Sequence, residues 1–467
     1  MALPFLKRAR NVVRAIRGYD GASPLAAQKR LAGMRFGNTV TETAAAAGPL
    51  AVRARYLVEN NDYAKRAVET KVTALVGTGA VPVSMHPDPD AAAEITAEIN
   101  RVSDSFFDGG FGAFQALMVQ EMVTAGEAVA QIIQTGDTFR LFPLSADQID
   151  RNYTASHGNG VEVLSGVEMT DGEETAIYVL PMIVGSLWPT YGGERVRVPA
   201  GEYVRIFKRR GAGQVRGVSD LASSITRLAE IDKTEDAYNV NITVSAMHCF
   251  YFTDENNVGG LPYTGTQTGG TLDAAPEPGV AKILPAGLKL QQTATQQVQQ
   301  VVEYLKMQLR AVAAGIGVPY HLMAGDSSDQ NYSSTRAELV GFKSQIERDQ
   351  FNLLVPGLLT PIYERAIRTA ALSGRLSVPG LDTDPDSALA VEWYFPPMPW
   401  VDPAKDAAAQ AELVANGFKS RRQVVAELGY DVAKIDAEIA ADKEREKTLG
   451  LSFPLTIQSV PAAGGAS

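Results

Sequence analysis

Two helical patterns joined by a short polar segment dominate the sequence. The first pattern repeats apolar residues every three or four positions, which places them on one helical face: Val298, Val302, Leu305, Leu309 and Val312. Gly315, Gly317 and Pro319 predict where this helix ends. A second long helix is expected to begin within residues 331–338, with Ser333, Ser334 or Thr335 as its cap. The segment between them is predicted to be a polar loop: Asp326, Ser327, Ser328, Asp329, Gln330 and Asn331.

The part of the chain before this helix pair mixes both periodicities. Helical spacing of apolar residues predicts helices over 53–75, 90–107, 111–125 and 220–247. Short runs bounded by turn residues predict strands over 81–85, 128–134, 139–144, 161–169, 175–181 and 203–207. Residues 51–210 therefore read as one α+β domain. The middle of the 220–247 helix, residues 230–236, is acidic, which is typical of a solvated helix face.

Glycine and proline change the pattern between Cys249 and Leu290. Seven glycines and four prolines in this stretch exclude a long helix. Short β-like runs at 250–252 and 281–284 flank it, so a small β or loop module is expected between two long helices.

The two ends of the chain differ from its middle. Residues 1–50 are expected to be a poorly packed leader with an Ala/Gly/Thr-rich stretch at 39–50. The basic residues that precede Asp20 are Lys7, Arg8, Arg10, Arg14 and Arg17. No apolar segment follows them, so they do not indicate a secretory signal. They indicate either a solvated tail or an arm that contacts DNA or an acidic partner.

After residue 338 the second helix is expected to run to about residue 371, kinked or divided at Pro356 and Pro361. A strand-like run at 391–395 follows. Three short helices are predicted at 404–416, 420–428 and 432–446, the second capped by Ser420, before a disordered tail at 451–467.

Composition narrows the function classes. A hydrophobic content of 45% permits a large core. The sequence contains no stretch of eighteen apolar residues, so no membrane span is predicted. A formal net charge of −10 argues against a protein that coats nucleic acid by neutralising phosphates. With Cys249 as the single cysteine, no intrachain disulfide or thiolate metal cluster can form.

No catalytic constellation emerges from the polar residues. The four histidines form no metal-binding pair, no phosphate loop is present, and Pro385 interrupts the calcium-like spacing at 382–386. Glu127 could in principle act in catalysis, but after Gly126 it is predicted to be a surface turn acid. Gly77-Thr78-Gly79 fits the end of a helix better than a nucleotide site. We therefore predict no enzyme activity, no cofactor and no metal.

Several separated motifs resemble the lambda-type phage portal proteins. The strongest is Gly317-Val318-Pro319-Tyr320, followed by the Gly325-Asp326 turn and the run at 331–336. Further matches lie at 53–61, 63–67, 76–79, 126–127 and 215–220. The resemblance implies an α+β portal fold assembled as a ring. In order, the parts implied are a leader at 1–50, a wing at 51–216, stem helices at 217–247 and 294–316 around a clip at 248–293, a turn and tunnel loop at 317–334, a long helix and second wing part at 335–395, a helical crown at 396–447 and a tail at 448–467.

The resemblance also implies a function. It implies a ring, usually a dodecamer, at one capsid vertex, through which double-stranded DNA is packaged and ejected. The implied partners are the large terminase subunit, major capsid and scaffolding proteins, and head-tail adaptor proteins, with no membrane. The protein would lie in the virion, and in the host cytoplasm during assembly. A non-enzymatic capsid-associated scaffold or a head-tail adaptor is the alternative, and a hydrolase ranks behind both.

Residue roles follow from that resemblance. The clip residues expected to contact terminase or adaptors are Asp254, Glu255, Asn256, Asn257, Tyr263 and Lys282. The apolar stripe 298–312 is expected to pack against neighbouring subunits, and the loop 326–331 to project into the channel. An uncharged or acidic loop offers DNA transient hydrogen bonds and no fixed ion pair, which suits sliding. If lysine at positions 326 and 329 left packaging unchanged, this hypothesis would lose its support.

Overall fold

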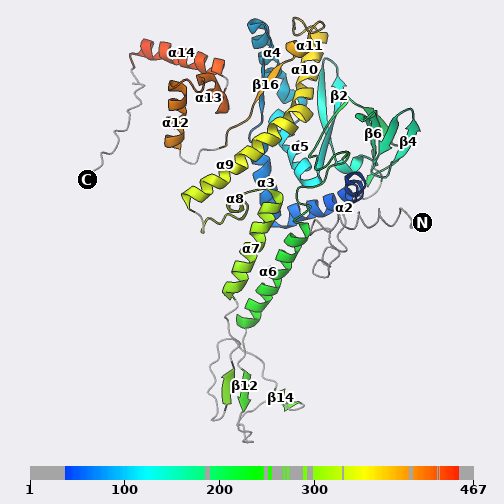
Figure 1. Cartoon of the computed structure of the whole chain (residues 1–467), viewed down its shortest axis with the longest axis vertical. Helices are drawn as coiled ribbons and strands as arrows, with labels where there is room; N and C mark the ends of the chain where they lie inside the picture. Colours follow the sequence, from blue (N-terminus) through cyan, green and yellow to red (C-terminus); the bar gives the residue numbers. More distant parts are fainter. Residues whose placement is uncertain are drawn as a thin grey trace, which may run out of the picture. The chain divides into compact units, whose positions relative to one another are not determined.

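A computed structural model describes residues 37–183, 185, 190–246, 251–254, 267–268, 271–272, 288–291, 298–328, 331–398, 403–428, 430 and 432–451 (Figure 1). The chain divides into two compact units. Unit 1 comprises Met1–Thr70, Gln120–Val129 and Pro143–Ser328, and unit 2 comprises Lys71–Val119, Ala130–Phe142 and Asp329–Ser467. Helices and strands are mixed in the described part, in agreement with the predicted α+β class.

The first described helix, α2 (Thr39–Asn60), corrects the expected leader. Residues 39–50 are part of this helix, and Ala47 is fully buried. Asn38 caps it, because its side chain accepts the Val40 amide at 3.0 Å. Alanine is the best helix former, which outweighs the single interior proline, Pro49. Helix α3 (Asp62–Val76) follows and ends at Gly77, which has a φ of +57° and confirms the predicted glycine stop.

Unit 1 contains a five-stranded antiparallel sheet in the order β10-β7-β6-β5-β4. Its strands are β4 (Ala155–Gly158), β5 (Val161–Leu164), β6 (Val167–Thr170), β7 (Glu173–Val179) and β10 (Val196–Pro199). The single strand predicted at 161–169 is therefore two strands. Ser165 and Gly166 form the turn between them, both with positive φ. In the register, Val167 faces Ile177.

The other strands of this region are short or shared. β2 (Glu127–Thr135) and β3 (Thr138–Leu144) join β11 (Tyr203–Phe207) in a sheet of order β11-β2-β3. β8 (Met182–Ile183) pairs with β9 (Thr190–Tyr191).

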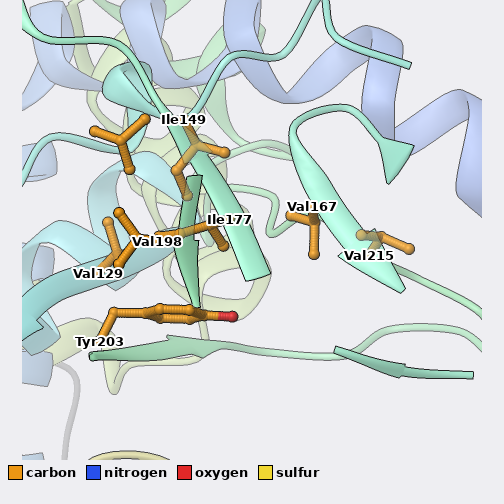
Figure 2. Close-up of a cluster of buried hydrophobic side chains, with 8 residues drawn as sticks. Val129, Ile149, Val167, Ile177, Val198, Tyr203 and Val215 are labelled. Atoms are coloured by element: carbon orange, nitrogen blue, oxygen red, sulfur yellow. The ribbon is translucent and has the colours of Figure 1, made fainter. Parts of the chain in front are cut away.

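A hydrophobic cluster from these strands and the segments that connect them forms a core of unit 1 (Figure 2). It contains Val129, Ile149, Val167, Ile177, Val179, Val198, Tyr203 and Val215. Beside it, Glu168 of β6 accepts hydrogen bonds from Arg197 Nε at 2.9 Å and Tyr178 at 2.8 Å. The hydrogen bonds from Arg197, with those from Tyr178 and Thr175, outweigh burial and lower the pKa of Glu168 to about 2.

The remaining helices of unit 1 are α6 (Ile225–Ala246), α7 (Val298–Ile316) and α8 (Tyr320–Ala324). α6 and α7 lie side by side (Figure 1). Between them in the chain, β12 (Tyr251–Asp254) pairs with β15 (Leu288–Gln291), and β13 (Gln267–Thr268) pairs with β14 (Thr271–Leu272). These pairs agree with a β module between two long helices, although the run at 281–284 lies outside the described residues.

Unit 2 contains most of the other helices. They are α4 (Pro89–Val102), α5 (Phe111–Ala125, shared with unit 1), α9 (Tyr332–Asp349), α10 (Thr360–Leu372), α11 (Pro385–Ala388), α12 (Pro403–Ala415), α13 (Arg421–Glu427) and α14 (Val432–Leu449). The predicted cap of α13 is confirmed, because Ser420 Oγ accepts the Gln423 amide at 3.1 Å. In unit 2, β1 (Val81–Ser84) pairs with β16 (Val391–Tyr394) in antiparallel register.

The long helix after the polar loop is divided as predicted. A π-helical segment, Gln350–Leu359, separates α9 from α10, and Pro356 lies within it. Pro361 occupies the first turn of α10, where its missing N–H is tolerated. Among the described residues, no helix combines the length and apolarity needed to cross a bilayer.

Candidate functional site

The helix pair α6–α7 is joined where α6 begins and α7 ends. Ser224 Oγ donates to the Val312 carbonyl, and Ser223 Oγ to the Gly315 carbonyl, both at 3.4 Å. A β-carbon on Gly315 would lie 2.6 Å from Ser224 Oγ, so glycine permits this close approach. Leu228 of α6 is fully buried near this end. The hydroxyl contacts and the small residue therefore fix the two helices at one end.

The predicted apolar stripe of α7 divides into two parts. Leu309 and Val312 are buried within the single chain, and Leu305 is half-buried. Val302 is exposed, and the structure does not describe the Val298 side chain. Contact with a neighbouring subunit therefore stays a prediction for the first part of the stripe, whereas the second part already has partners in its own chain.

A second face of α7 is mostly exposed and carries no charge, since three of its four residues are exposed and Ala311 is half-buried. It consists of Tyr304, Met307, Ala311 and Ala314, which follow one another by three or four residues and which we term the exposed arc. Met307 is 55% exposed and Tyr304 47% exposed. The charged residues of α7 form a separate stripe: Glu303, Lys306 and Arg310. On α6, Val240 is likewise 62% exposed.

The charged stripe of α7 contacts the loop that follows α8. Gly325, with a φ of +68°, ends α8. Asp326 then accepts hydrogen bonds from Ser328 Oγ at 2.6 Å, from the Ser328 amide at 3.0 Å and from Tyr320 Oη at 3.0 Å. Lys306 Nζ lies 3.3 Å from Asp326 Oδ2. The Ser328 hydrogen bonds, with those from Tyr320 and Lys306, lower the pKa of Asp326.

These contacts add an intramolecular ion pair at the base of the loop, whereas weak contact between the loop and DNA stays a prediction. Asp326 has an intramolecular cationic partner, so its charge is already compensated. Ser327 is exposed, and Asp329 and Gln330 lie outside the described residues. Asn331 is the N-cap of α9, because its side chain accepts the Ser334 amide at 2.9 Å. The cap is thus neither Ser333, Ser334 nor Thr335, although Ser334 completes the capping box.

Of the six expected clip residues, the structure describes only Asp254. Asp254 is the last residue of β12. The other five residues lie outside the described part of the chain: Glu255, Asn256, Asn257, Tyr263 and Lys282.

A buried charge cluster, which the sequence did not reveal, lies next to the start of α6. Glu127, predicted to be a surface acid, is 0% exposed. It accepts hydrogen bonds from Arg216 Nε at 2.8 Å and Arg205 Nη1 at 3.0 Å, and Arg216 Nη2 also donates to it. Arg205 bridges further to Glu174, with 2.9 Å between Nε and Oε1. No local pattern indicates this cluster, because Arg216 is 89 positions away.

Electrostatics explain why this acid remains ionised. Burial alone would raise the pKa of Glu127, but the charges of Arg216 and Arg205 hold this pKa below its ordinary value. Because arginines enclose both carboxylate oxygens, the group is unavailable as a general base. Within the described residues, no group of three or more His, Cys, Asp or Glu side chains could hold a metal ion.

Two glycines allow this cluster to form. A β-carbon on Gly217 would lie 2.0 Å from the Gly126 carbonyl oxygen. A β-carbon on Gly126 would lie 2.4 Å from the Val218 carbonyl carbon. The backbones at 126–127 and 216–218 therefore touch directly. Ser219 continues the contact, because its hydroxyl donates to the Val123 carbonyl at 3.3 Å. The segment that enters α6 is thus fixed to the end of α5.

Arg151 differs from the other arginines of the cluster. Its Nη2 lies 3.8 Å from Glu127 and 3.6 Å from Asp147. Its three side-chain nitrogens are buried and make no hydrogen bond. Burial, together with the charge of Arg216, lowers the pKa of Arg151. This arginine adds positive charge to the cluster without the hydrogen bonds that normally accompany a buried guanidinium.

Comparison with known proteins identifies the family. Residues 28–350, more than half of the chain, match the family described as phage portal protein, lambda family. The chain belongs to the lambda family of phage portal proteins. No curated protein matches the sequence significantly.

Solved structures show a weak similarity. A chain of "Virion of native gene transfer agent (GTA) particle" has 16% identity and a TM-score of 0.45, over 81% of this chain and 92% of that chain. A chain of "Neck of native GTA particle computed with C12 symmetry" has 16% identity and a TM-score of 0.45, over 80% and 91%. An HK97 family phage portal protein from Corynebacterium diphtheriae has 12% identity and a TM-score of 0.32, over 76% and 97%. The family assignment rests on the sequence match.

Proposed function

We propose that this portal protein forms a closed ring at one capsid vertex, through which double-stranded DNA is packaged and later ejected. Family membership supports the location and the role. In this proposal the ring docks the large terminase subunit during packaging and head-tail adaptor proteins afterwards, and it contacts capsid and scaffolding proteins. It would assemble in the host cytoplasm and remain in the virion.

The parts of the subunit are assigned as the family resemblance implies. α6 and α7 form the stem, and residues 248–293 between them form the clip. The wing combines residues 51–216 and 335–395, and the crown comprises residues 396–447. The loop that begins at Asp326 borders the channel. Twelve copies are proposed for the particle.

The observation that carries the ring proposal is the exposed arc of α7. A solvated helix face normally carries charged residues, yet Tyr304, Met307, Ala311 and Ala314 include none. Exposed Val240 gives α6 an apolar position of its own. A head-to-tail contact between different surfaces of identical chains generates a ring when the rotation closes. The exposed arc of one subunit against α6 of the next is such a contact, and small alanines allow close helix packing.

The charges of the loop refine the idea of weak contact with DNA. Phosphate contacts by lysine or arginine give strong, salt-dependent binding. Lys306, the cation next to the loop, is already paired with Asp326. Residues 325–328 contain no lysine or arginine, and the neighbouring Lys306 is engaged by Asp326. This part of the loop therefore offers the phosphates of the duplex no strong cationic contact. Lysine at position 326 would place two cations together and displace the loop, so lysine at position 329 alone is the cleaner test of weak grip.

The test is the mass and shape of the purified full-length protein. A subunit of 49.9 kDa should appear as a particle many times that mass, with a central hole in negative-stain images. We expect Met307→Glu to shift the population to monomers and small oligomers, because it places a charge in the exposed arc. Glu303→Gln, on the charged stripe of the same helix, should leave the ring intact. A wild-type monomer with no ring would refute the proposal.

A further inference from the structure

Lys306 is unusual among the lysines of a helix surface. Its side chain is only 22% exposed, although lysine normally extends its ammonium group into water. The ammonium contacts two groups of the segment after α8, Asp326 Oδ2 at 3.3 Å and Ser328 Oγ at 3.2 Å. Lys306 therefore connects the helix α7 to the beginning of the loop.

Both carboxylate oxygens of Asp326 are occupied. Oδ2 receives Lys306 and Tyr320, and Oδ1 receives the amide and the hydroxyl of Ser328. Tyr320 is itself supported by α7, because the Arg310 guanidinium lies 5.4 Å from the centre of its ring. The charged stripe of α7 thus supports the loop through two different residues.

A third contact fixes α8, which precedes the loop. Arg66 Nε of α3 donates to the Leu322 carbonyl at 3.3 Å. Arg66 holds α8 at Leu322, and Arg310 of α7 holds it at the Tyr320 ring. Asp326 therefore occupies a defined place beside α7. Donors from Lys306, Tyr320 and Ser328 thus converge on the Asp326 carboxylate.

We propose that Lys306 is the positioning residue for the channel loop, and that the Lys306–Asp326 contact fixes the base of this loop to the stem helix α7. The inference rests on the proposed channel role of the loop. It follows that groups available to a passing duplex begin at Ser327. It also follows that a force applied to the loop is transmitted to α7 at the base of the loop, where Lys306 contacts Asp326 and Ser328.

A contact between Lys306 and DNA is the competing role. In that role the ammonium would have to leave Asp326 and Ser328 and cross to a phosphate. Removal of Asp326 would then release the lysine and strengthen DNA binding. The positioning role predicts instead that removal of either partner loosens the same segment.

The single cysteine makes this measurable. In a Cys249→Ser background, Ser327→Cys can carry a nitroxide, whose spectral line width reports the motion of the loop. Purified full-length protein with Lys306→Met should show clearly narrower lines, and Asp326→Asn a similar narrowing. The double variant should narrow them no further than either single variant, because both remove one contact. Lys343→Met, which removes the Lys343–Glu347 pair on α9, is the matched control and should change nothing.

The outcomes separate this inference from the ring proposal. Two results would overturn the positioning role. One is a nitroxide line width that Lys306→Met leaves unchanged, and the other is a double variant whose narrowing equals the sum of the narrowing in the two single variants. Narrowed lines that coincide with a lowered thermal midpoint of the whole protein would also overturn it, because they would indicate general destabilisation. Negative-stain images of the same samples report the ring independently, so a ring with unchanged lines refutes only the role of Lys306.

Discussion

Two arginines that flank the same buried acid should differ sharply in what they contribute to stability. Arg216 is 1% exposed, and its guanidinium makes hydrogen bonds to Glu127, to the Ser165 carbonyl at 2.6 Å and to the Ala146 carbonyl at 3.2 Å. Arg151 lies beside the same carboxylate, and none of its nitrogens makes a hydrogen bond. The pair of variants Arg216→Met and Arg151→Met exploits this difference.

The expected magnitudes follow from these contacts. Arg216→Met removes one partner of a buried ion pair, which typically costs about 3–5 kcal/mol. It also leaves two buried carbonyls without their donors, and each such group costs about 1–3 kcal/mol. Because these costs overlap, we expect a loss of about 3–5 kcal/mol. Arg151→Met removes a buried charge without hydrogen bonds, so the change should stay within about 1 kcal/mol in either direction.

Urea denaturation followed by circular dichroism measures both variants against the wild type at neutral pH. The difference between the variants is the decisive quantity, because both place methionine at an arginine position next to Glu127. Equal destabilisation by the two variants would show that net charge governs the cluster, and the reasoning from hydrogen bonds would be wrong.

Two other perturbations have equally direct readouts. Gly217→Ala would place a β-carbon 2.0 Å from the Gly126 carbonyl oxygen, so thermal unfolding should show a loss of about 3 kcal/mol or more. In Gly341→Ala, on α9, the new β-carbon would meet no atom within 4 Å, so the protein should become more stable by about 0.5–1 kcal/mol. If Gly341→Ala were the more destabilising of the two variants, the close contact at Gly217 would be contradicted. Glu168 has its pKa lowered to about 2, so its stabilising effect is complete above the unfolded value of 4.5 and is lost as pH falls towards 2. Acid titration of Glu168→Gln should therefore show a smaller loss of stability between these limits than the wild type, and identical curves would exclude this role.

Patterns local in sequence predicted the helices and strands well. α7 and β11 appear where periodicity and turn residues placed them, and Pro356 and Pro361 marked the division of the long helix. Propensity misled at α2, where two local signals competed. Gly48 and Pro49 hid the first half of α2, whose alanines prevail.

Long-range charge pairs could not be predicted from the sequence. Gly126-Glu127 has the composition of a surface turn, and only the fold brings Arg205 and Arg216 to it. The same is true of Asp326, whose partner Lys306 is on another element. Burial within one chain also cannot be separated from burial between chains by periodicity. Leu309 and Tyr304 are both apolar positions of α7, but only the structure shows which of them is covered.

The pairing of β1 with β16 affects how this chain is made. Val81 pairs with Tyr394 and Ser84 pairs with Val391, so about 310 residues of chain separate the two strands. At a synthesis rate of about 5–20 residues per second, the ribosome needs about 15–60 s to deliver the second strand. Throughout that interval the hydrogen-bonding edge of the first strand has no native partner, and an open edge is a template for aggregation. Nascent chains of this protein should therefore depend on chaperones until β16 has left the ribosome.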